Sequence, residues 1–389
     1  MIDVLWAAPS CSAEPSGVQA RVNDLLHYHR ARGREDVRIE VAAIGWDGPE
    51  TASWPMQQIH YSNGSRVDKL LNVMSTAINH RNVDILHLTN LPPVLRWILP
   101  LTAPKTPMIV GPNNTGKMFP ESVLDDDVIS VMEQEKGDVV RRWRLYGERR
   151  ERATHWTYKH LRPGQTTYVA QSRFSEDILR ERGISEDSIT VLPSGVRTDV
   201  FTPEGDSVPW PGRSSNRLRV LYIGRPDRRK GIDVLFDAVE MCIQSGTALS
   251  VAVLGGSEPP NFLTNHSARD YVSFEGTQPR RQLAKYYRSA DVFVTPSRYE
   301  AEPTVMIESL ACGTPVIATD DRPFTEIGNP DSCIFFNRGD SVDLFRAIQS
   351  LSNSLNRFRS GARSHASDYN IEQTYQAIVE TYKRCLRDI

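Results

Sequence analysis

The chain has 389 residues, more than one ordinary hydrophobic core supports, which favours two domains of about 150–200 residues each. Its composition, 39% hydrophobic and 24% charged, is that of an ordinary globular protein. The net charge of −2 argues against general nucleic-acid binding, which needs a strongly basic face, and no apolar run approaches the roughly 20 residues that span a bilayer.

Strand-like runs alternate with helical stretches along the whole chain. The predicted strands are Val4–Ala8, Ile39–Ile44, Ile85–Leu88, Met108–Val110, Thr167–Ala170, Ile189–Leu192, Arg219–Ile223, Ser250–Leu254, Val272–Phe274, Val292–Thr295, Val316–Ala318 and Ile334–Phe336. The predicted helices include Val18–Arg32, Val67–Asn79, Phe174–Arg182, Asp233–Gln244, Arg281–Arg288 and Ser341–Ser350. Such alternation is typical of an α/β fold with parallel sheets joined by right-handed crossovers, and the length suits two sheets.

Proline, glycine and serine cluster between residues 194 and 216, which predicts the domain boundary there. We expect a first domain over residues 1–193 and a second over residues 194–367. A last helical stretch, Glu372–Arg387, follows them.

One region of the first domain has an unusual charge pattern. Residues 121–135 hold six acidic side chains, and residues 141–162 are basic and aromatic. This pattern favours a long amphipathic surface helix beside an acidic partner. Contact of residues 137–162 with an anionic membrane or a lipid-linked acceptor is one alternative, and an acceptor-specificity lid is another.

The start of the chain and its cysteines bear on the compartment. Residues 1–6 lack a basic leader and run directly into a strand, so no secretory signal is expected. The five cysteines form no C-x-x-C pair, and three lie in apolar stretches where a thiol serves as a small core residue: Cys242, Cys312 and Cys333. We therefore expect a reduced cytoplasmic location.

The clearest functional pattern lies between residues 296 and 319. A strand ends at Thr295, a polar loop carries Glu300, and the helix that follows carries Glu308. Two carboxylates thus stand at the carboxyl edge of the sheet, where α/β proteins bind ligands. The N–H groups of Thr304 and Val305 at the helix start can donate to phosphate oxygens. The combination suits a sugar nucleotide, because carboxylates accept hydrogen bonds from sugar and ribose hydroxyls.

This segment resembles the E-x7-E signature of the retaining glycosyltransferases of family 4, which have the GT-B fold. Three further segments resemble motifs of that family, in the family's order: the interdomain turn Val191–Val196, the donor-phosphate segment Ile223–Leu235, and the strand and helix that frame the base, Val272–Gly276 followed by Leu283, Tyr287, Ala290 and Asp291. The resemblance covers residues 165–382 and is looser before them. It implies two Rossmann-like domains whose parallel sheets face a central cleft. It also implies that a carboxyl-terminal helix, residues 368–389, completes the acceptor-side domain, while the second domain binds the donor.

The resemblance implies roles for single residues. Arg225 and Lys230 are expected to stabilise the charge on the departing diphosphate, Arg225 as a two-pronged donor and Lys230 as a point charge. Glu308 is expected to bind the ribose hydroxyls, and Glu300 the hydroxyls of the transferred sugar. Further nucleotide-sugar contacts are expected from Gly17, Gly224, Thr277, Thr304 and Val305.

Two weaker candidates for contact with the sugar or the acceptor lie in the first domain. His87 ends the strand Asp84–Leu88 and faces the cleft in the expected register, although a histidine satisfied within the core explains it as well. Asn113 stands where many relatives place a histidine, and it cannot titrate. Glu302 and the segment Asp321–Pro323 also depart from the family pattern, which bears on sugar preference rather than on the reaction class.

No metal ion or other cofactor is expected. Asp125–Asp127 contains a D-x-D pattern, but it follows no strand, and no residue spacing resembles a zinc or calcium site. The predicted function is a retaining transfer of a hexose-type sugar from a UDP- or GDP-sugar to a hydroxyl of a lipid-linked saccharide, a polysaccharide or a small metabolite. Same-face attack needs no protein nucleophile, and a double displacement through Glu300 stays open. The alternatives are a non-catalytic sugar-nucleotide-binding protein, a sugar-nucleotide epimerase and a phosphorylase.

Overall fold

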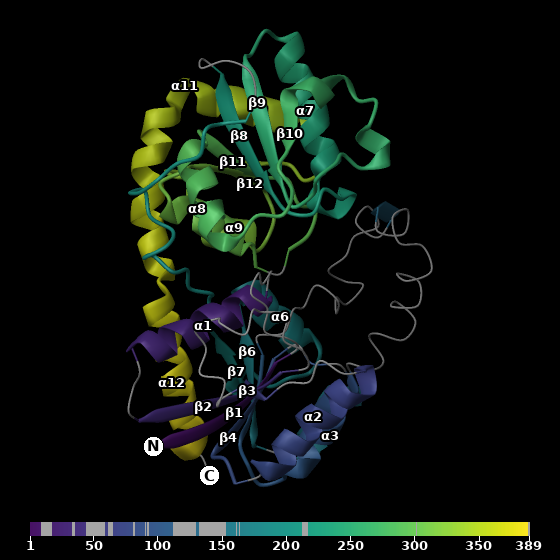
Figure 1. The fold of residues 1–389 in the computed structure, drawn as a ribbon, viewed down its shortest axis with the longest axis vertical. Helices are drawn as coiled ribbons and strands as arrows, with labels where there is room; N and C mark the ends of the chain where they lie inside the picture. The colour runs from purple at the N-terminus through teal and green to yellow at the C-terminus, as the bar shows by residue number, and fades with distance from the viewer. Residues whose placement is uncertain are drawn as a thin grey trace. The chain divides into compact units, whose positions relative to one another are not determined.

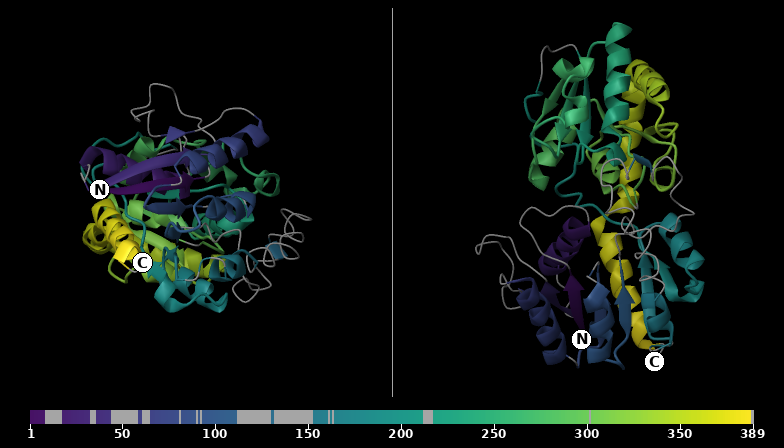
Figure 2. Two further views of the ribbon diagram at one scale, coloured as in Figure 1. Left: turned by 90° about the horizontal axis from the view of Figure 1, so that it is seen from below. Right: turned by 90° about the vertical axis from the view of Figure 1, so that its right-hand side faces the viewer.

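The computed structural model describes residues 1–8, 18–32, 36–43, 59–60, 65–80, 82–89, 91, 93–111, 130–131, 153–160, 162, 164–211, 217–300 and 302–387. They form two compact units, each built on a parallel sheet with helices on both faces (Figures 1 and 2). The first unit draws on Met1–Val123, Arg141–Gly195 and Ile371–Ile389, and the second on Leu124–Val140 and Val196–Asn370. The main crossing into the second unit thus follows residue 195, and the chain returns to the first unit at residue 371. The central cleft between the domains stays a prediction.

The described strands of the first unit form a seven-stranded parallel sheet in the order β3-β2-β1-β4-β5-β6-β7. Their bounds are β1 Ile2–Ala8, β2 Val37–Ala43, β3 Ile59–His60, β4 Ile85–Leu88, β5 Met108–Val110, β6 Thr166–Ala170 and β7 Ile189–Val191. Successive side chains of β1 enter opposite cores, as expected for a strand covered on both faces: Val4 and Trp6 pack on one side, Leu5 and Ala7 on the other.

Two groups of helices cover this sheet. Helices α1 (Val18–Arg32) and α12 (Ile371–Arg387) share one core, and α2 (Arg66–Asn79), α3 (Pro93–Thr102) and α6 (Arg173–Glu181) share the other. The apolar face of α12 repeats at helical spacing and supplies Ile371, Tyr375, Ile378, Val379, Tyr382 and Cys385 to the first core. The carboxyl-terminal helix is thus part of the first unit.

The described strands of the second unit form a six-stranded parallel sheet in the order β10-β9-β8-β11-β12-β13. Their bounds are β8 Leu218–Ile223, β9 Leu249–Leu254, β10 Val272–Phe274, β11 Val292–Thr295, β12 Val316–Thr319 and β13 Cys333–Phe336. The order reverses between β8 and β11, so the loops that leave these two strands diverge to opposite sides. In doubly wound sheets, ligands bind at the carboxyl ends of the strands at this switch point.

On one face of this sheet lie α7 (Ile232–Gln244) and most of α11 (Ser341–Ala366), and on the other lie α8 (Arg280–Ser289) and α9 (Thr304–Ala311). A short helix, α10 (Phe324–Ile327), follows β12. The helix expected over Ser341–Ser350 continues to Ala366, through a kink at Ser354 with φ −135° and ψ 20°. No helix among the described residues has both the length and the apolar character needed to cross a membrane.

Candidate functional site

The loop after β8 is held by its own hydrogen bonds. The Tyr222 hydroxyl donates to the carbonyl oxygen of Arg225 over 2.8 Å. The Asp227 carboxylate caps the turn Arg228–Lys230 by accepting from the Lys230 N–H at 2.9 Å. The two expected cations, Arg225 and Lys230, therefore stand on a defined loop at the switch point.

This loop is fastened to the loop after β11. Gly231 adopts φ 70°, and a Cβ on it would lie 1.9 Å from the carbonyl oxygen of Pro296, so only glycine fits. Two parallel bonds of 2.8 and 2.9 Å join the Arg298 guanidinium to the Asp233 carboxylate. The backbone N–H of Arg298 also donates to the backbone carbonyl oxygen of Arg229 at 2.9 Å. These contacts hold together two loops about seventy positions apart.

The two loops bring Glu300 against Lys230. The Lys230 ammonium forms an ion pair and hydrogen bond with Glu300, and the Arg229 guanidinium lies 4.0 Å from the same carboxylate oxygen. The side chains of Lys230 and Glu300 are 18% and 14% exposed. Burial alone would raise the pKa of Glu300, but Lys230 and Arg229 outweigh it, and the pKa lies below its ordinary value. Glu300 is therefore an ionised acceptor at neutral pH.

Arg225 has a different environment on the same loop. Its side chain is 63% exposed, and its guanidinium lies 3.4 Å from Asp227, an ion pair that solvent weakens. Gly224 directly follows β8, and Thr277 is exposed in the loop that follows β10. Arg225 is thus a cation accessible to an anionic ligand at the switch point.

Glu308 lies in α9, as the sequence predicts, and its side chain is only 4% exposed. The Arg280 guanidinium donates to Oε1 at 2.5 Å, and the Tyr287 hydroxyl lies 3.3 Å from Oε2. The Tyr287 hydroxyl also lies 2.9 Å from the carbonyl oxygen of Val305. Tyr287 belongs to the helical segment that resembles the family's base-framing motif, but its contact with Glu308 was not predicted, and Arg280 was missed, because nothing local in α8 indicates that it packs against α9.

One expected phosphate donor is corrected by the structure. The N–H of Thr304 donates to the carbonyl oxygen of Glu302 at 3.0 Å, since the chain turns tightly into α9. Thr304 is therefore not an open donor, and the N–H of Val305 stays a prediction. Gly17 and Asn113 lie outside the described residues.

His87 is also corrected, because the structure makes it a core residue. Its ring is buried and stacks on Trp6 with centroids 4.3 Å apart. Nδ1 lies 2.9 Å from the Tyr382 hydroxyl, and Nε2 lies 2.6 Å from the carbonyl oxygen of Gly111. Burial lowers the pKa of His87 to about 4. With both nitrogens engaged, His87 offers no contact to a sugar or an acceptor.

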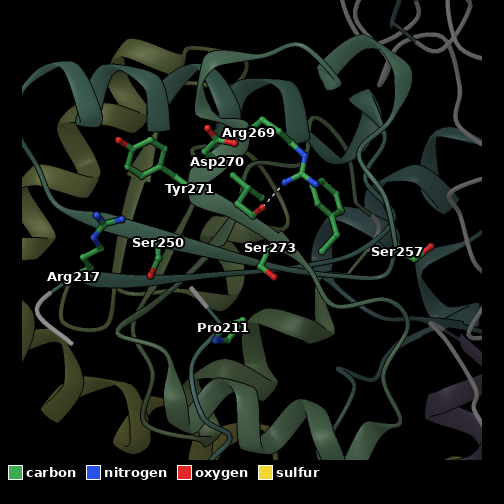
Figure 3. A pocket seen from close by; sticks show the side chains of 10 residues that line it. Pro211, Arg217, Ser250, Ser257, Arg269, Asp270, Tyr271 and Ser273 are labelled. Atoms are coloured by element: carbon green, nitrogen blue, oxygen red, sulfur yellow. Dashed lines mark hydrogen bonds between the residues drawn. The ribbon is translucent and has the colours of Figure 1, made fainter. Parts of the chain in front are cut away.

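A separate cavity of about 370 Å³ lies along the edge strand β10 (Figure 3). It is lined by Pro211, Arg217, Ser250, Ser257, Arg269, Asp270, Tyr271, Val272, Ser273 and Phe274. None of the predicted site residues lines it. The cations and carboxylates that the sequence predicts to bind a sugar nucleotide lie instead on the loops after β8 and β11 and on α9. Among the described residues no group of three His, Cys, Asp or Glu side chains could hold a metal ion, and Asp125–Asp127 lie outside them.

Comparison with protein families matches both halves of the chain. Residues 15–200 match the model described as Glycosyltransferase Family 4, and residues 210–365 match the model described as Glycosyl transferases group 1. A D-inositol 3-phosphate glycosyltransferase of Nocardiopsis dassonvillei is 30% identical over 227 residues, covering 53% of each chain. One of Geodermatophilus obscurus is 31% identical over 209 residues, covering 49% of this chain and 46% of its own. The chain thus spans about half the length of the curated relatives it matches.

Solved structures resemble the whole chain. A sucrose-phosphate synthase from Thermosynechococcus elongatus matches with a TM-score of 0.71 at 17% identity, covering 100% of both chains. The HepE protein of Anabaena, solved with UDP-glucose, matches with a TM-score of 0.70 at 15% identity, covering 99% of this chain and 100% of its own. WaaG, a glycosyltransferase of lipopolysaccharide biosynthesis, matches with a TM-score of 0.67 at 16% identity, covering 97% and 99%. These likenesses confirm the predicted fold.

Proposed function

The chain belongs to the glycosyltransferases of family 4 and has the GT-B fold, and from this premise we propose that it is a retaining, metal-independent hexosyltransferase. Its donor is a nucleoside-diphosphate sugar, and its acceptor presents a hydroxyl. The observation that carries the proposal is the meeting of Lys230, Arg229 and Glu300 at the switch point of the second sheet, with Arg225 on the same loop.

Arg225 and Lys230 can stabilise the negative charge that the reaction produces on the leaving group. When the bond between the anomeric carbon and the diphosphate breaks, negative charge accumulates on the phosphate oxygens. Positive groups already in place stabilise that charge without reorganising. Arg225 is exposed enough to bind two phosphate oxygens, and Lys230 is held nearby as a point charge. This arrangement supplies the stabilisation that a metal ion supplies in other phosphate-transfer sites.

We assign Glu300 to binding the transferred sugar rather than the phosphate. Because its lowered pKa keeps it ionised, it accepts hydrogen bonds from hydroxyls of the transferred sugar. In same-face attack the departing phosphate oxygen takes the proton of the acceptor hydroxyl, so the protein supplies no nucleophile. In the alternative, the Glu300 carboxylate displaces the nucleoside diphosphate and forms a glycosyl ester, which predicts an enzyme heavier by one hexosyl residue after incubation with donor alone.

The choice of substrates to test follows from the relatives. HepE is solved with UDP and with UDP-glucose, so UDP-hexoses come first among donors, followed by GDP-mannose. Inositol phosphates come first among small acceptors, because the curated relatives named above act as D-inositol 3-phosphate glycosyltransferases.

A turnover assay tests the proposal. Each donor is incubated with and without acceptors, and release of the nucleoside diphosphate is followed with the anomeric configuration of the product. Transfer with retention, or slow donor hydrolysis, supports the proposal. Tight donor binding with no release of nucleotide favours the non-catalytic alternative, and inversion at the anomeric carbon contradicts the mechanism.

We also propose that the acceptor side contacts an anionic membrane surface. Exposed large apolar side chains occur on helices that cover one face of the first sheet: Leu71, Ile78, Trp97, Leu101 and Trp156. The Trp97 indole donates to Thr154 at 2.8 Å, which links α3 to the helical residues 153–160. Lys105, just after α3, and Lys159, in the same helical residues as Trp156, are exposed as well. Exposed tryptophans beside lysines are typical of proteins that lie on anionic bilayers. Residues 137–152 of the basic segment lie outside the described part.

Vesicle sedimentation tests this contact. Phosphatidylcholine vesicles with and without phosphatidylglycerol are compared, for the wild type and for the double variant Leu101→Glu, Trp156→Glu. We expect binding only to anionic vesicles and a loss in the double variant. Phe262→Glu, which alters an exposed apolar residue of the second unit, serves as the control. Equal binding by the double variant contradicts the proposed surface.

A further inference from the structure

Arg280 and Tyr287 approach Glu308 from one face of α8. The two residues are seven positions apart, which is two helical turns, so their side chains project in the same direction toward α9. Each meets a different oxygen of the Glu308 carboxylate, Arg280 at Oε1 and Tyr287 at Oε2. The Tyr287 hydroxyl has one hydrogen and lies closer to the carbonyl oxygen of Val305, at 2.9 Å, so the charged hydrogen bond from Arg280 is the main contact that orients the carboxylate.

The arginine is itself held in place. Its side chain is 21% exposed, and its guanidinium carbon lies 5.2 Å from the centre of the Phe201 ring, which is buried. Stacking on a buried ring confines the guanidinium plane. Because the Glu308 side chain is 4% exposed, its charge needs a fixed partner, and Arg280 supplies one.

We propose that Arg280 is a positioning residue that makes the nucleotide site selective for a ribonucleotide. This inference rests on the proposed function, in which Glu308 accepts hydrogen bonds from the ribose. Oriented by Arg280, Glu308 presents its two oxygens to the 2′- and 3′-hydroxyls together. A 2′-deoxynucleotide lacks one of those hydroxyls and therefore loses one charge-assisted hydrogen bond to the carboxylate. Such a loss weakens binding by roughly tenfold to a hundredfold.

The test measures the ratio of the dissociation constants for the 2′-deoxynucleotide and the ribonucleotide by calorimetry. UDP and GDP are compared on the wild type, and the tighter one is carried forward with its 2′-deoxy counterpart. Arg280→Met keeps an unbranched stem against Phe201 but removes the charge. We expect it to weaken ribonucleotide binding about tenfold and 2′-deoxynucleotide binding much less, so that the ratio falls toward one. Arg280→Lys is expected to restore part of the ratio.

Arg219→Met is the matched control. Arg219 forms an ion pair with Asp291, at 2.8 Å against 2.5 Å for Arg280 and Glu308, where β8 and β11 begin, at the opposite edge of the same sheet. The control is expected to lower the melting temperature but to leave the ratio unchanged. If Arg280→Met keeps the wild-type ratio, Arg280 is a structural ion pair and the inference is wrong, while the proposed function stands. If the wild type binds neither nucleotide, or does not distinguish ribose from deoxyribose, the ribose role of Glu308 fails as well.

Discussion

Replacing Lys230 by methionine removes the ammonium from the ion pair with Glu300 and keeps a side chain of similar length. Glu300 then remains 14% exposed with the Arg229 guanidinium 4.0 Å away. Removing one partner of a buried ion pair costs about 3–5 kcal/mol, and because Arg229 retains part of the attraction we expect a loss of about 2–3 kcal/mol in the free energy of unfolding. We expect the rate of sugar transfer to fall about 10²–10³-fold, as when one preorganised charge contact is lost.

The double variant Lys230→Met, Glu300→Gln separates these effects. Neutralising Glu300 removes the buried charge that Lys230 balanced, so most of the lost stability should return, to within about 1 kcal/mol of the wild type. Activity should not return, because the charge that meets the diphosphate is still missing. Urea unfolding followed by tryptophan fluorescence measures the first quantity, and release of nucleoside diphosphate measures the second.

Two results would refute this reasoning. A double variant no more stable than Lys230→Met would show that pairing with Lys230 is not what stabilises Glu300. Wild-type turnover by Lys230→Met would show that the loop after β8 does not meet the departing phosphate.

Three further predictions concern the two units and the reaction. Burial holds the pKa of His87 at about 4, against 6.5 in the unfolded chain, so the unfolded chain takes up the proton first as the pH falls. The folded protein should therefore lose about 3 kcal/mol of unfolding free energy between pH 6.5 and pH 4. Urea unfolding at several pH values measures this loss, which should be smaller in His87→Gln. Gly231→Ala should lower the unfolding free energy by about 3 kcal/mol or more, because the new Cβ would clash with Pro296. Gly246→Ala, at φ 81° with open space around it, should lower it by about 1 kcal/mol. Equal losses in the two variants would contradict the contact with Pro296. Turnover should be unchanged after dialysis against a chelator, and a loss restored by a divalent cation would contradict the metal-independent mechanism.

The sequence predicted the fold well because strand and helix patterns are local. Apolar runs such as Ser250–Leu254 and Val272–Phe274 lie within a residue of β9 and β10, since strands buried on both faces read as continuous apolar stretches. It missed β3, which has two residues, and α3, which has Pro100 inside it. It also ended α11 near residue 350, where polar residues interrupt the helical pattern before the kink.

Only the site residues that belong to sequence motifs could be predicted. The motif positions of Glu300, Glu308 and Lys230 follow from the sequence, but their partners do not. Arg280 and Tyr287 meet Glu308 only because α8 packs on α9, and no local pattern encodes that packing. His87 reads as a strand-end histidine, yet its role depends on Tyr382, which lies 295 positions later in the chain.

The predicted cytoplasmic location stays a prediction. Four cysteines of the described residues are free thiols buried in the two units, and Cys11 lies outside those residues. Free buried thiols are common in proteins of reducing compartments.

The most direct test of the account is a crystal structure of this protein with UDP or GDP bound. We predict the diphosphate against Arg225 and Lys230 and the ribose hydroxyls on Glu308, at the carboxyl ends of β8 and β11. A nucleotide bound elsewhere, for example in the cavity beside Arg217 and Tyr271, would contradict it.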